Sequence, residues 1–263
     1  LITSLSNNQI KQIRKLREKK YRSETGLFFL EGIRIVIEAL QTSGFVEQLI
    51  ISRDLINGDK ALEAVKDAQE KNISILEVNE DVFKSLSGKD GPQGVAAVAR
   101  QKWSDIEDIR DSIHGIWIAL YQVADPGNLG TILRTLDGMG GKGIILLDNC
   151  TDPYDPSAIR ASMGTIFSKS IIKLNSEDFV SLIRKNKTKV VGTSDAAKKD
   201  YRSYHYNKDM VLLMGSEREG LPEKLVEVCD EVVSIPMLGK ADSLNLAVAS
   251  SIMLYEIAAQ QWE

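Results

Sequence analysis

The first hundred residues alternate between short apolar runs and longer segments in which apolar positions recur with helical spacing. We expect strands near residues 27–30, 48–52, 73–78 and 94–99. We expect helices near residues 33–41, 61–71 and 80–86. Strands that alternate with helices in this way are typical of an α/β domain. The pattern therefore predicts a smaller α/β domain over residues 1–100.

The same alternation resumes at residue 116, after a charged segment that begins Q-K-W-S-D-I-E-D-I-R-D-S. We interpret residues 101–113 as a linker and residues 114–263 as a second domain. Its strands are expected near 116–123, 143–148, 169–174, 188–193, 210–214 and 231–235. Its helices are expected near 129–139, 156–163, 177–185, 222–228 and 243–260. This order predicts a mostly parallel sheet that is covered on both faces.

One further helix is expected over residues 7–20, where Ile10, Ile13 and Leu16 form an apolar stripe. Its opposite face is basic, with the single anion Glu18 among these cations: Lys11, Arg14, Lys15, Arg17, Lys19, Lys20 and Arg22. The net charge of -4 and the pI near 5.5 argue against wholesale coating of nucleic acid. The basic face is therefore either a solvated surface or a local patch for an anionic partner.

Composition indicates an ordinary globular protein, with 43% apolar and 27% charged residues. The two cysteines, Cys150 and Cys229, lie far apart in the sequence, so we expect neither a disulfide framework nor a metal site. The first residues lack the pattern of a signal peptide, and the apolar stretch 244–255 is too short to span a bilayer. We therefore expect a cytoplasmic protein without a membrane segment.

Three glycines satisfy the spacing of a dinucleotide-binding motif but occur in the wrong structural context. Gly138, Gly140 and Gly143 fit G-x-G-x-x-G, and Asp148 follows them. That motif requires a strand before the glycines and a helix after them, so that the phosphates meet a helix N-terminus. Here a helical pattern precedes the glycines and a strand pattern follows them. We expect these glycines to end a helix and turn the chain.

Three other segments share one design, in which a polar turn leads into an apolar helix. They are A-D-P-G-N-L-G-T-I-L-R (124–134), L-M-G-S-E-R-E-G-L (213–221) and I-P-M-L-G-K-A-D-S-L-N-L-A-V-A (235–249). We expect Asn128 to cap the first helix, Asp242 or Ser243 to cap the last one, and Asn245 to lie in its first turn. The first two segments directly follow predicted strands, which is where open α/β sheets bind ligands.

In this order, the three segments resemble the motifs of the SpoU family of RNA ribose 2′-O-methyltransferases, which belongs to the SPOUT class. The similarity covers residues 114–260. The segment K-L-R-E-K-K-Y-R-S-E-T-G-L-F-F-L-E-G (15–32) is similar to an N-terminal substrate-binding domain related to ribosomal protein L30e. The resemblance implies a trefoil knot in the second domain, S-adenosylmethionine as cofactor, an RNA substrate and a homodimer with a shared active site.

The resemblance also implies roles for particular residues. Five positions match those that hold the cofactor, namely Gly215, Ile235, Met237, Ser243 and Leu244. Five match polar positions for substrate binding and catalysis, namely Asn128, Arg134, Glu217, Ser243 and Asn245. Arg218 departs from the family, which often has glycine after the glutamate, so the conformation of this loop is in question. With an RNA substrate, the seven N-terminal cations are predicted to contact phosphates.

The expected reaction is methylation of a ribose 2′-hydroxyl in structured RNA, with 23S ribosomal RNA favoured because a separate L30e-like domain suits a folded RNA. A transfer RNA substrate remains open. So do a non-catalytic RNA-binding or ribosome-assembly factor, a knotted methyltransferase that modifies a base nitrogen, and a role in drug resistance. The intact Arg134, Glu217 and Asn245 favour an enzyme over a non-catalytic factor.

Overall fold

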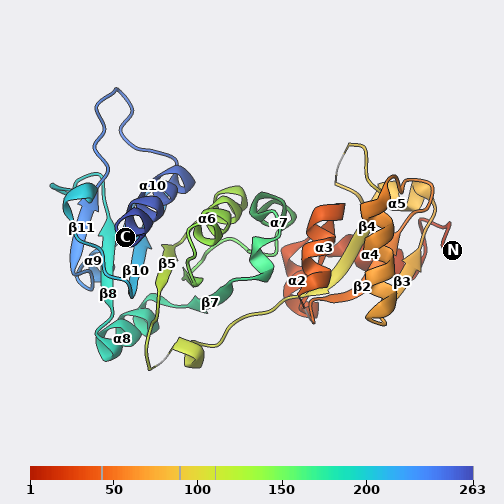
Figure 1. The fold of residues 1–263 in the computed structure, drawn as a ribbon, viewed down its shortest axis with the longest axis horizontal. Coiled ribbons are helices and arrows are strands. Elements are labelled where there is room, and N and C mark those ends of the chain that lie inside the picture. The colour runs from red at the N-terminus through yellow and green to blue at the C-terminus, as the bar shows by residue number, and fades with distance from the viewer. Residues whose placement is uncertain (43, 89, 110, 263) are drawn as a thin grey trace. The chain divides into compact units, whose positions relative to one another are not determined.

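A computed structural model describes residues 1–42, 44–88, 90–109 and 111–262. The chain forms two compact units, which are described separately. Unit 1 contains Leu1–Lys102 and Asp152–Ser168, and unit 2 contains Trp103–Thr151 and Lys169–Glu263. Figure 1 shows the elements of both units along the chain.

Unit 1 is built on a mixed sheet with the strand order β1-β4-β2-β3. β1 (Leu27–Glu31) and β2 (Val46–Ile51) both pair antiparallel with β4 (Val95–Arg100), and β3 (Ser74–Glu77) pairs parallel with β2. Its α-helices are α1 (Asn8–Lys15), α2 (Lys19–Thr25), α3 (Ile33–Gln41), α4 (Asp59–Glu70), α5 (Glu80–Leu86) and α7 (Pro156–Ser162). A 3-10 turn, η2 (Thr165–Phe167), follows α7. The α/β pattern expected for the N-terminal part is confirmed.

The single helix expected over residues 7–20 is wrong, because the chain forms two short helices there. α1 begins after Asn7, whose side chain accepts from two backbone amides of its first turn, and it ends at Lys15. α2 begins at Lys19 and ends at Thr25, and the next residue, Gly26, adopts a left-handed φ of 66° that favours glycine. The expected apolar stripe of Ile10, Ile13 and Leu16 is buried in a core with Phe83 and Leu86 of α5.

Residues 152–168 pack with unit 1, although sequence analysis assigned them to the second domain. Arg22, which is only 1% exposed, makes one of the contacts that join them. Its guanidinium lies 2.7 Å from Asp152 Oδ2 and 3.3 Å from Asp155 Oδ2, and it also donates to the carbonyls of Leu16 and Arg17. Arg22 was predicted to contact RNA; the structure contradicts this, because its charge is buried and paired.

Unit 2 is built on a larger parallel sheet with the strand order β7-β6-β5-β10-β8-β11-β9. Its strands are β5 (Ile116–Tyr121), β6 (Gly143–Leu147), β7 (Ser170–Leu174), β8 (Lys189–Thr193), β9 (Lys199–Asp200), β10 (Met210–Met214) and β11 (Glu231–Ser234). Every pairing in this sheet is parallel. The expected mostly parallel sheet is confirmed, and β9 is an edge strand that sequence analysis missed.

Helices cover both faces of this sheet. They are α6 (Pro126–Gly138), α8 (Ser176–Asn186), α9 (Glu223–Val226) and α10 (Leu246–Ala259), with 3-10 turns η1 (Ile106–Ile109) and η3 (Tyr201–Ser203). On one face, Phe179, Leu182 and Ile183 of α8 pack against Leu147 of β6 and Leu213 of β10. α6 and α10 pack against each other, with Thr135 Oγ1 hydrogen-bonded to Ser251 Oγ at 2.9 Å. Burial on both faces explains why the central strands are apolar without interruption.

The glycines that resemble a dinucleotide motif form a helix end, as expected. Gly140 has a left-handed φ of 81°, and its amide donates to Asp137 while that of Gly141 donates to Leu136. This is the Schellman arrangement of a helix C-terminus. Asp148 accepts from the amide and hydroxyl of Ser176 at 2.9 and 2.6 Å, so it ties the end of β6 to the start of α8. These residues therefore have structural roles.

None of the helices formed by the described residues is both long and apolar enough to cross a membrane.

Candidate active site

The three polar segments meet at one edge of the sheet in unit 2. β5, β10, β8 and β11 are consecutive neighbours in the sheet and all run in the same direction. Their carboxyl ends therefore lie along the same edge, which is where parallel sheets bind ligands. The segment 124–134 follows β5, 213–221 includes the end of β10, and 235–249 follows β11.

Side chains from all three segments form one hydrogen-bonded chain. Glu217 accepts from Asn128 Nδ2 at 3.2 Å and from the Ala124 amide at 3.4 Å. Asn128 Oδ1 in turn accepts from Asn245 Nδ2 at 3.0 Å. Because an ionised carboxylate can only accept, these contacts fix the orientation of both amides. Each bond contributes only about 1 kcal/mol, so the chain positions its groups more than it stabilises the fold.

The helix caps differ from those that sequence analysis expected. Asp125 caps α6, and its side chain accepts from the amide of Asn128, which lies inside the first turn. Asn245 caps α10 by accepting from the amides of Ala247 and Val248. Neither Asp242 nor Ser243 caps this helix. The Asn128 side chain is thereby free for Glu217 and Asn245, and Asn245 joins a helix end to the polar cluster.

The loop after β10 is closed tightly and presents a charged tip. Ser216 and Gly220 exchange both backbone hydrogen bonds, so Glu217, Arg218 and Glu219 are exposed between them. Gly215 permits this closure, because a Cβ there would lie 2.3 Å from the carbonyl carbon of Gly220. The Arg218 departure is accommodated at the exposed tip, and it leaves Glu217 in contact with Asn128.

Arg134 lies on α6 and is exposed. Within the part of the chain that the structure describes, its guanidinium has neither a hydrogen-bond partner nor an acidic partner. A planar guanidinium with five free donors suits recognition of phosphate or ribose oxygens. Ser243 is also exposed and has no hydrogen bond within the described residues. The structure thus joins Asn128, Glu217 and Asn245 directly, but not Arg134 or Ser243.

The predicted cofactor residues lie at the carboxyl ends of β10 and β11. Gly215 is buried, Ile235, Met237 and Leu244 are half-buried, and Ser243 is exposed. From residue 235 to 244 the backbone makes no hydrogen bond with any other described residue. Figure 1 shows this loop projecting beyond the ends of β11 and α10. The loop therefore leaves backbone donors and acceptors free for a ligand beside the half-buried apolar side chains of Ile235, Met237 and Leu244.

Sequence analysis did not include the turn after β8 in this site. β8 lies between β10 and β11, and its last residue, Thr193, donates to Met214 Sδ at 3.4 Å. The following T-S-D-A-A turn therefore lies at the same edge, with the Ser194 amide bonded to Val233 of β11. A polar turn after an apolar strand was the available signal. Only the strand order reveals that it adjoins the other three segments.

The predicted RNA-contacting cations of unit 1 fall into different classes. Lys11, Lys19 and Lys20 are exposed. Lys15 lies over the Tyr21 ring at 4.8 Å, and Arg14 donates to Ser85 Oγ at 2.9 Å. Arg17 donates to the carbonyls of Leu86 and Ser87 at the end of α5, at 2.7 and 2.6 Å. With Arg22 buried, the exposed lysines are the strongest candidates for phosphate contacts.

Neither cysteine is suited to nucleophilic chemistry. Burial raises the pKa of the Cys150 thiol to about 11 and that of the Cys229 thiol to about 12. Both thiols are therefore protonated at neutral pH, and the thiolate is the reactive form. Among the described residues, no group of three or more histidine, cysteine or acidic side chains could hold a metal ion.

A parallel sheet with polar loops at the carboxyl ends of four neighbouring strands is typical of α/β proteins that bind a ligand at this edge. The chain belongs to the SpoU rRNA methylase family, whose model matches residues 115–255. Residues 7–97 match the MRM3-like substrate binding domain. The expected family is thereby confirmed, and so is its SPOUT fold preceded by a separate N-terminal domain.

The chain is similar to characterised relatives over nearly its whole length. It is 28% identical to the 23S rRNA (guanosine(2553)-2′-O)-methyltransferase RlmP of Bacillus subtilis, covering 97% of this chain and 98% of the relative. It is 29% identical to the 23S rRNA (uridine(2479)-2′-O)-methyltransferase of Streptomyces viridochromogenes, covering 94% and 87%.

Solved structures agree with these similarities. The AdoMet-bound rRNA methyltransferase from Sinorhizobium meliloti is 39% identical, with a TM-score of 0.90 over 100% of this chain and 98% of that one. The SpoU methyltransferase AviRb from Streptomyces viridochromogenes, in complex with AdoMet, is 27% identical, with a TM-score of 0.84 over 97% and 98%.

Proposed function

We propose that this protein transfers a methyl group from S-adenosylmethionine to a ribose 2′-hydroxyl of structured RNA, with 23S ribosomal RNA as the substrate. The observation that carries the proposal is the chain of hydrogen bonds from Glu217 through Asn128 to Asn245. It brings the polar residues of three family segments together at the ligand-binding edge of the sheet. The 23S rRNA 2′-O-methyltransferases among the relatives support the choice of RNA.

The cofactor site is proposed at the loops after β10 and β11. Gly215, Ile235, Met237, Ser243 and Leu244 are the residues that would hold the cofactor, chiefly through the free backbone groups of residues 235–244. These residues fit the cofactor, because the apolar side chains of Ile235, Met237 and Leu244 lie beside backbone donors and acceptors. When bound, S-adenosylmethionine supplies the methyl group together with its own leaving group. The protein therefore mainly has to orient the ribose and manage its proton.

Arg134 is proposed to clamp the substrate. A guanidinium stays protonated at physiological pH, so Arg134 cannot act as the general base. Its free donors can hold a phosphate and favour negative charge that develops on the 2′-oxygen. The proton then leaves late, to a phosphate oxygen or to water. Glu217 and Asn128 orient the nucleotide, and Asn245 keeps Asn128 in place.

A homodimer with a shared active site is part of this proposal. α10 carries apolar residues on its exposed side as well as its buried side, with Val248 48% and Tyr255 47% exposed. Trp262, just beyond the helix, packs edge-on against Tyr255. A helix that is apolar on all sides is typically covered. A second copy of the chain is the proposed cover, and the cytoplasm is the proposed location, where ribosomal RNA is available.

The test uses purified protein, S-adenosylmethionine labelled in its methyl group, and unmodified 23S rRNA or unmodified transfer RNA. Label should appear in 23S rRNA, and nuclease mapping should place it on a ribose. Label in transfer RNA alone would move the substrate to that class, and label on a base nitrogen would exclude ribose chemistry. Cofactor binding without methyl transfer to RNA from cells that lack the protein would favour the non-catalytic alternative.

A further inference from the structure

A hollow of about 340 Å³ lies in unit 1, in a region to which the proposed reaction assigns no role. Its lining comes from β1, the end of α5 and α7, and all of these elements belong to unit 1. The walls include Phe29, Leu30, Leu86 and Ile159. This volume is near the lower end of the range for small-molecule sites, which are mostly apolar with a few polar groups.

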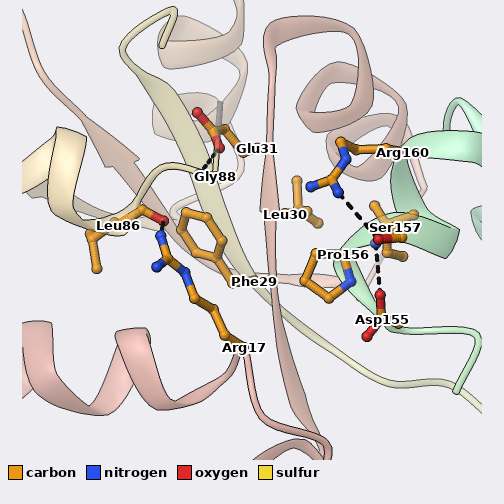
Figure 2. A pocket seen from close by; sticks show the side chains of 11 residues that line it. Arg17, Phe29, Leu30, Glu31, Leu86, Gly88, Asp155, Pro156, Ser157 and Arg160 are labelled. Atoms are coloured by element: carbon orange, nitrogen blue, oxygen red, sulfur yellow. Dashed lines mark hydrogen bonds between the residues drawn. The ribbon is translucent and has the colours of Figure 1, made fainter. Parts of the chain in front are cut away.

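Two arginines face this hollow without acidic partners. Arg17 uses Nη2 to hold the carbonyls at the end of α5, and Arg160 uses Nη2 to hold Ser157 Oγ at 3.2 Å. Figure 2 shows the Arg160 guanidinium reaching from α7 toward Leu30, and the Arg17 guanidinium below Leu86. Within the described residues neither forms an ion pair. Asp155 also lines the hollow, but its carboxylate is already bound to Arg22 at 3.3 Å and to the Ser157 amide at 2.8 Å. The two guanidinium groups, which have no ion-pair partner of their own, therefore favour an anionic ligand such as phosphate.

A buried carboxylate in the wall of the hollow argues against a site for phosphate alone. Glu31 ends β1, is only 9% exposed, and accepts from Ser87 Oγ at 2.5 Å and from the Gly88 amide at 3.1 Å. Each carboxylate oxygen has a further lone pair, so Glu31 can still accept from a ligand. A carboxylate would repel a second anion, so its partner must be a group that donates hydrogen bonds. The hollow therefore combines positions for an anion and for a neutral donor.

An RNA nucleotide carries both kinds of group. Phosphate suits the arginines, and the imino and amino groups of guanine form two parallel donors that suit a carboxylate. Phe29 and the apolar wall offer a surface for the base, and RNA is commonly read through unstacked bases in loops and bulges. Building on the proposed function, we propose that this hollow binds one unstacked guanosine nucleotide of the RNA substrate, with Glu31 reading the base and Arg17 and Arg160 holding phosphate.

The test measures binding to the full chain by calorimetry, with guanosine 5′-monophosphate, uridine 5′-monophosphate and ribose 5-phosphate as probes. Guanosine monophosphate should bind about tenfold more tightly than ribose 5-phosphate, because two additional hydrogen bonds are made. Glu31→Gln should remove this preference while ribose 5-phosphate binding is retained. Thermal unfolding of the variant shows whether the fold has been kept.

Arg160→Ala should weaken all three probes, by about tenfold for the loss of one charged contact. Arg184→Ala is the matched control, because Arg184 is an exposed helical arginine of unit 2 without an acidic partner among the described residues. It should leave binding unchanged. Equal binding of guanosine monophosphate and ribose 5-phosphate would overturn the proposal. So would equal effects of the two arginine substitutions.

Cofactor binding and methyl transfer are measured on the same variants. Glu31→Gln and Arg160→Ala should bind S-adenosylmethionine like the unaltered protein, because its proposed site lies in unit 2. An active methyltransferase without a guanosine preference would overturn this inference alone. A protein that binds guanosine monophosphate as described but neither binds the cofactor nor transfers methyl groups would contradict the proposed function instead.

Discussion

Arg134 is the residue whose replacement should affect turnover most. It is exposed on α6 and free of protein partners in the described part of the chain, so its substitution leaves the fold unstrained. Arg134→Ala removes both the positive charge and the planar set of guanidinium donors, whereas Arg134→Lys keeps only the charge. Both variants should bind S-adenosylmethionine normally and lose methyl transfer at least a hundredfold, or about 3 kcal/mol, with lysine recovering a small part. Full activity in the alanine variant would remove Arg134 from the mechanism.

The two cysteines should resist thiol reagents in the folded protein. With pKa values raised to about 11 and about 12, Cys150 and Cys229 are protonated at pH 8, and only about one Cys150 thiol in a thousand is ionised. Their reactivity should increase as the pH rises toward these values. A disulfide reagent at pH 8 should label neither residue until denaturant is added, and methyl transfer should survive the reagent. Rapid labelling of the native protein would contradict the burial of both thiols.

At the scale of elements, two glycines distinguish the cofactor loop from the helix end. Gly215→Val should abolish S-adenosylmethionine binding in calorimetry, because any Cβ there meets the backbone of Gly220 and displaces the turn. Gly140→Ala meets no atom within 4 Å and bears only the strain of a positive φ, roughly 1 kcal/mol, so binding should persist.

Thermal unfolding of both variants separates a displaced turn from a general loss of fold. Retained cofactor binding in a folded Gly215→Val protein, together with its loss in Gly140→Ala, would reverse the assignment of the two loops. The stability cost of Gly140→Ala should appear in the unfolding midpoint without a change in affinity.

At the scale of the whole molecule, the N-terminal cations should contribute to RNA affinity and not to chemistry. Replacing Lys11, Lys19 and Lys20 with glutamine should weaken RNA binding and reduce its salt dependence. Each lost phosphate contact removes roughly 0.7 to 0.9 from the log-log slope. Lys60, Lys198 and Lys208 are also exposed, so the same change there is a control of equal charge. Equal slopes for the two triple variants would place the RNA surface elsewhere.

The proposed homodimer can be tested by mixing two inactive proteins. If each active site uses Arg134 from one chain and the cofactor loop of the other, Arg134→Ala and Gly215→Val subunits should together form one working site. A random mixture should then recover about a quarter of the original activity. Subunit exchange is verified with differently tagged chains. Exchange without recovered activity would argue against a site shared in this way.

The sequence by itself determined most of the order of helices and strands, except for the break between α1 and α2 and the edge strand β9. It also determined the parallel sheet of unit 2 and the polar turns that follow its strands. These features depend on local periodicity and turn chemistry, which neighbouring residues supply. It likewise distinguished the glycines at 138–143 from a phosphate loop, since the order of helix and strand around them is a local property.

Only the tertiary structure decided which distant groups meet. Asn128 lies 89 residues from Glu217 and 117 from Asn245. Their contact depends on the order of the strands in the sheet, which the pattern of apolar and polar residues along the chain does not specify. The burial of Arg22 likewise depends on carboxylates 130 and 133 residues away. In the sequence it is one more cation of a basic run. Its paired and buried state follows from packing, because the energy of a charge is set by its surroundings and not by its neighbours along the chain.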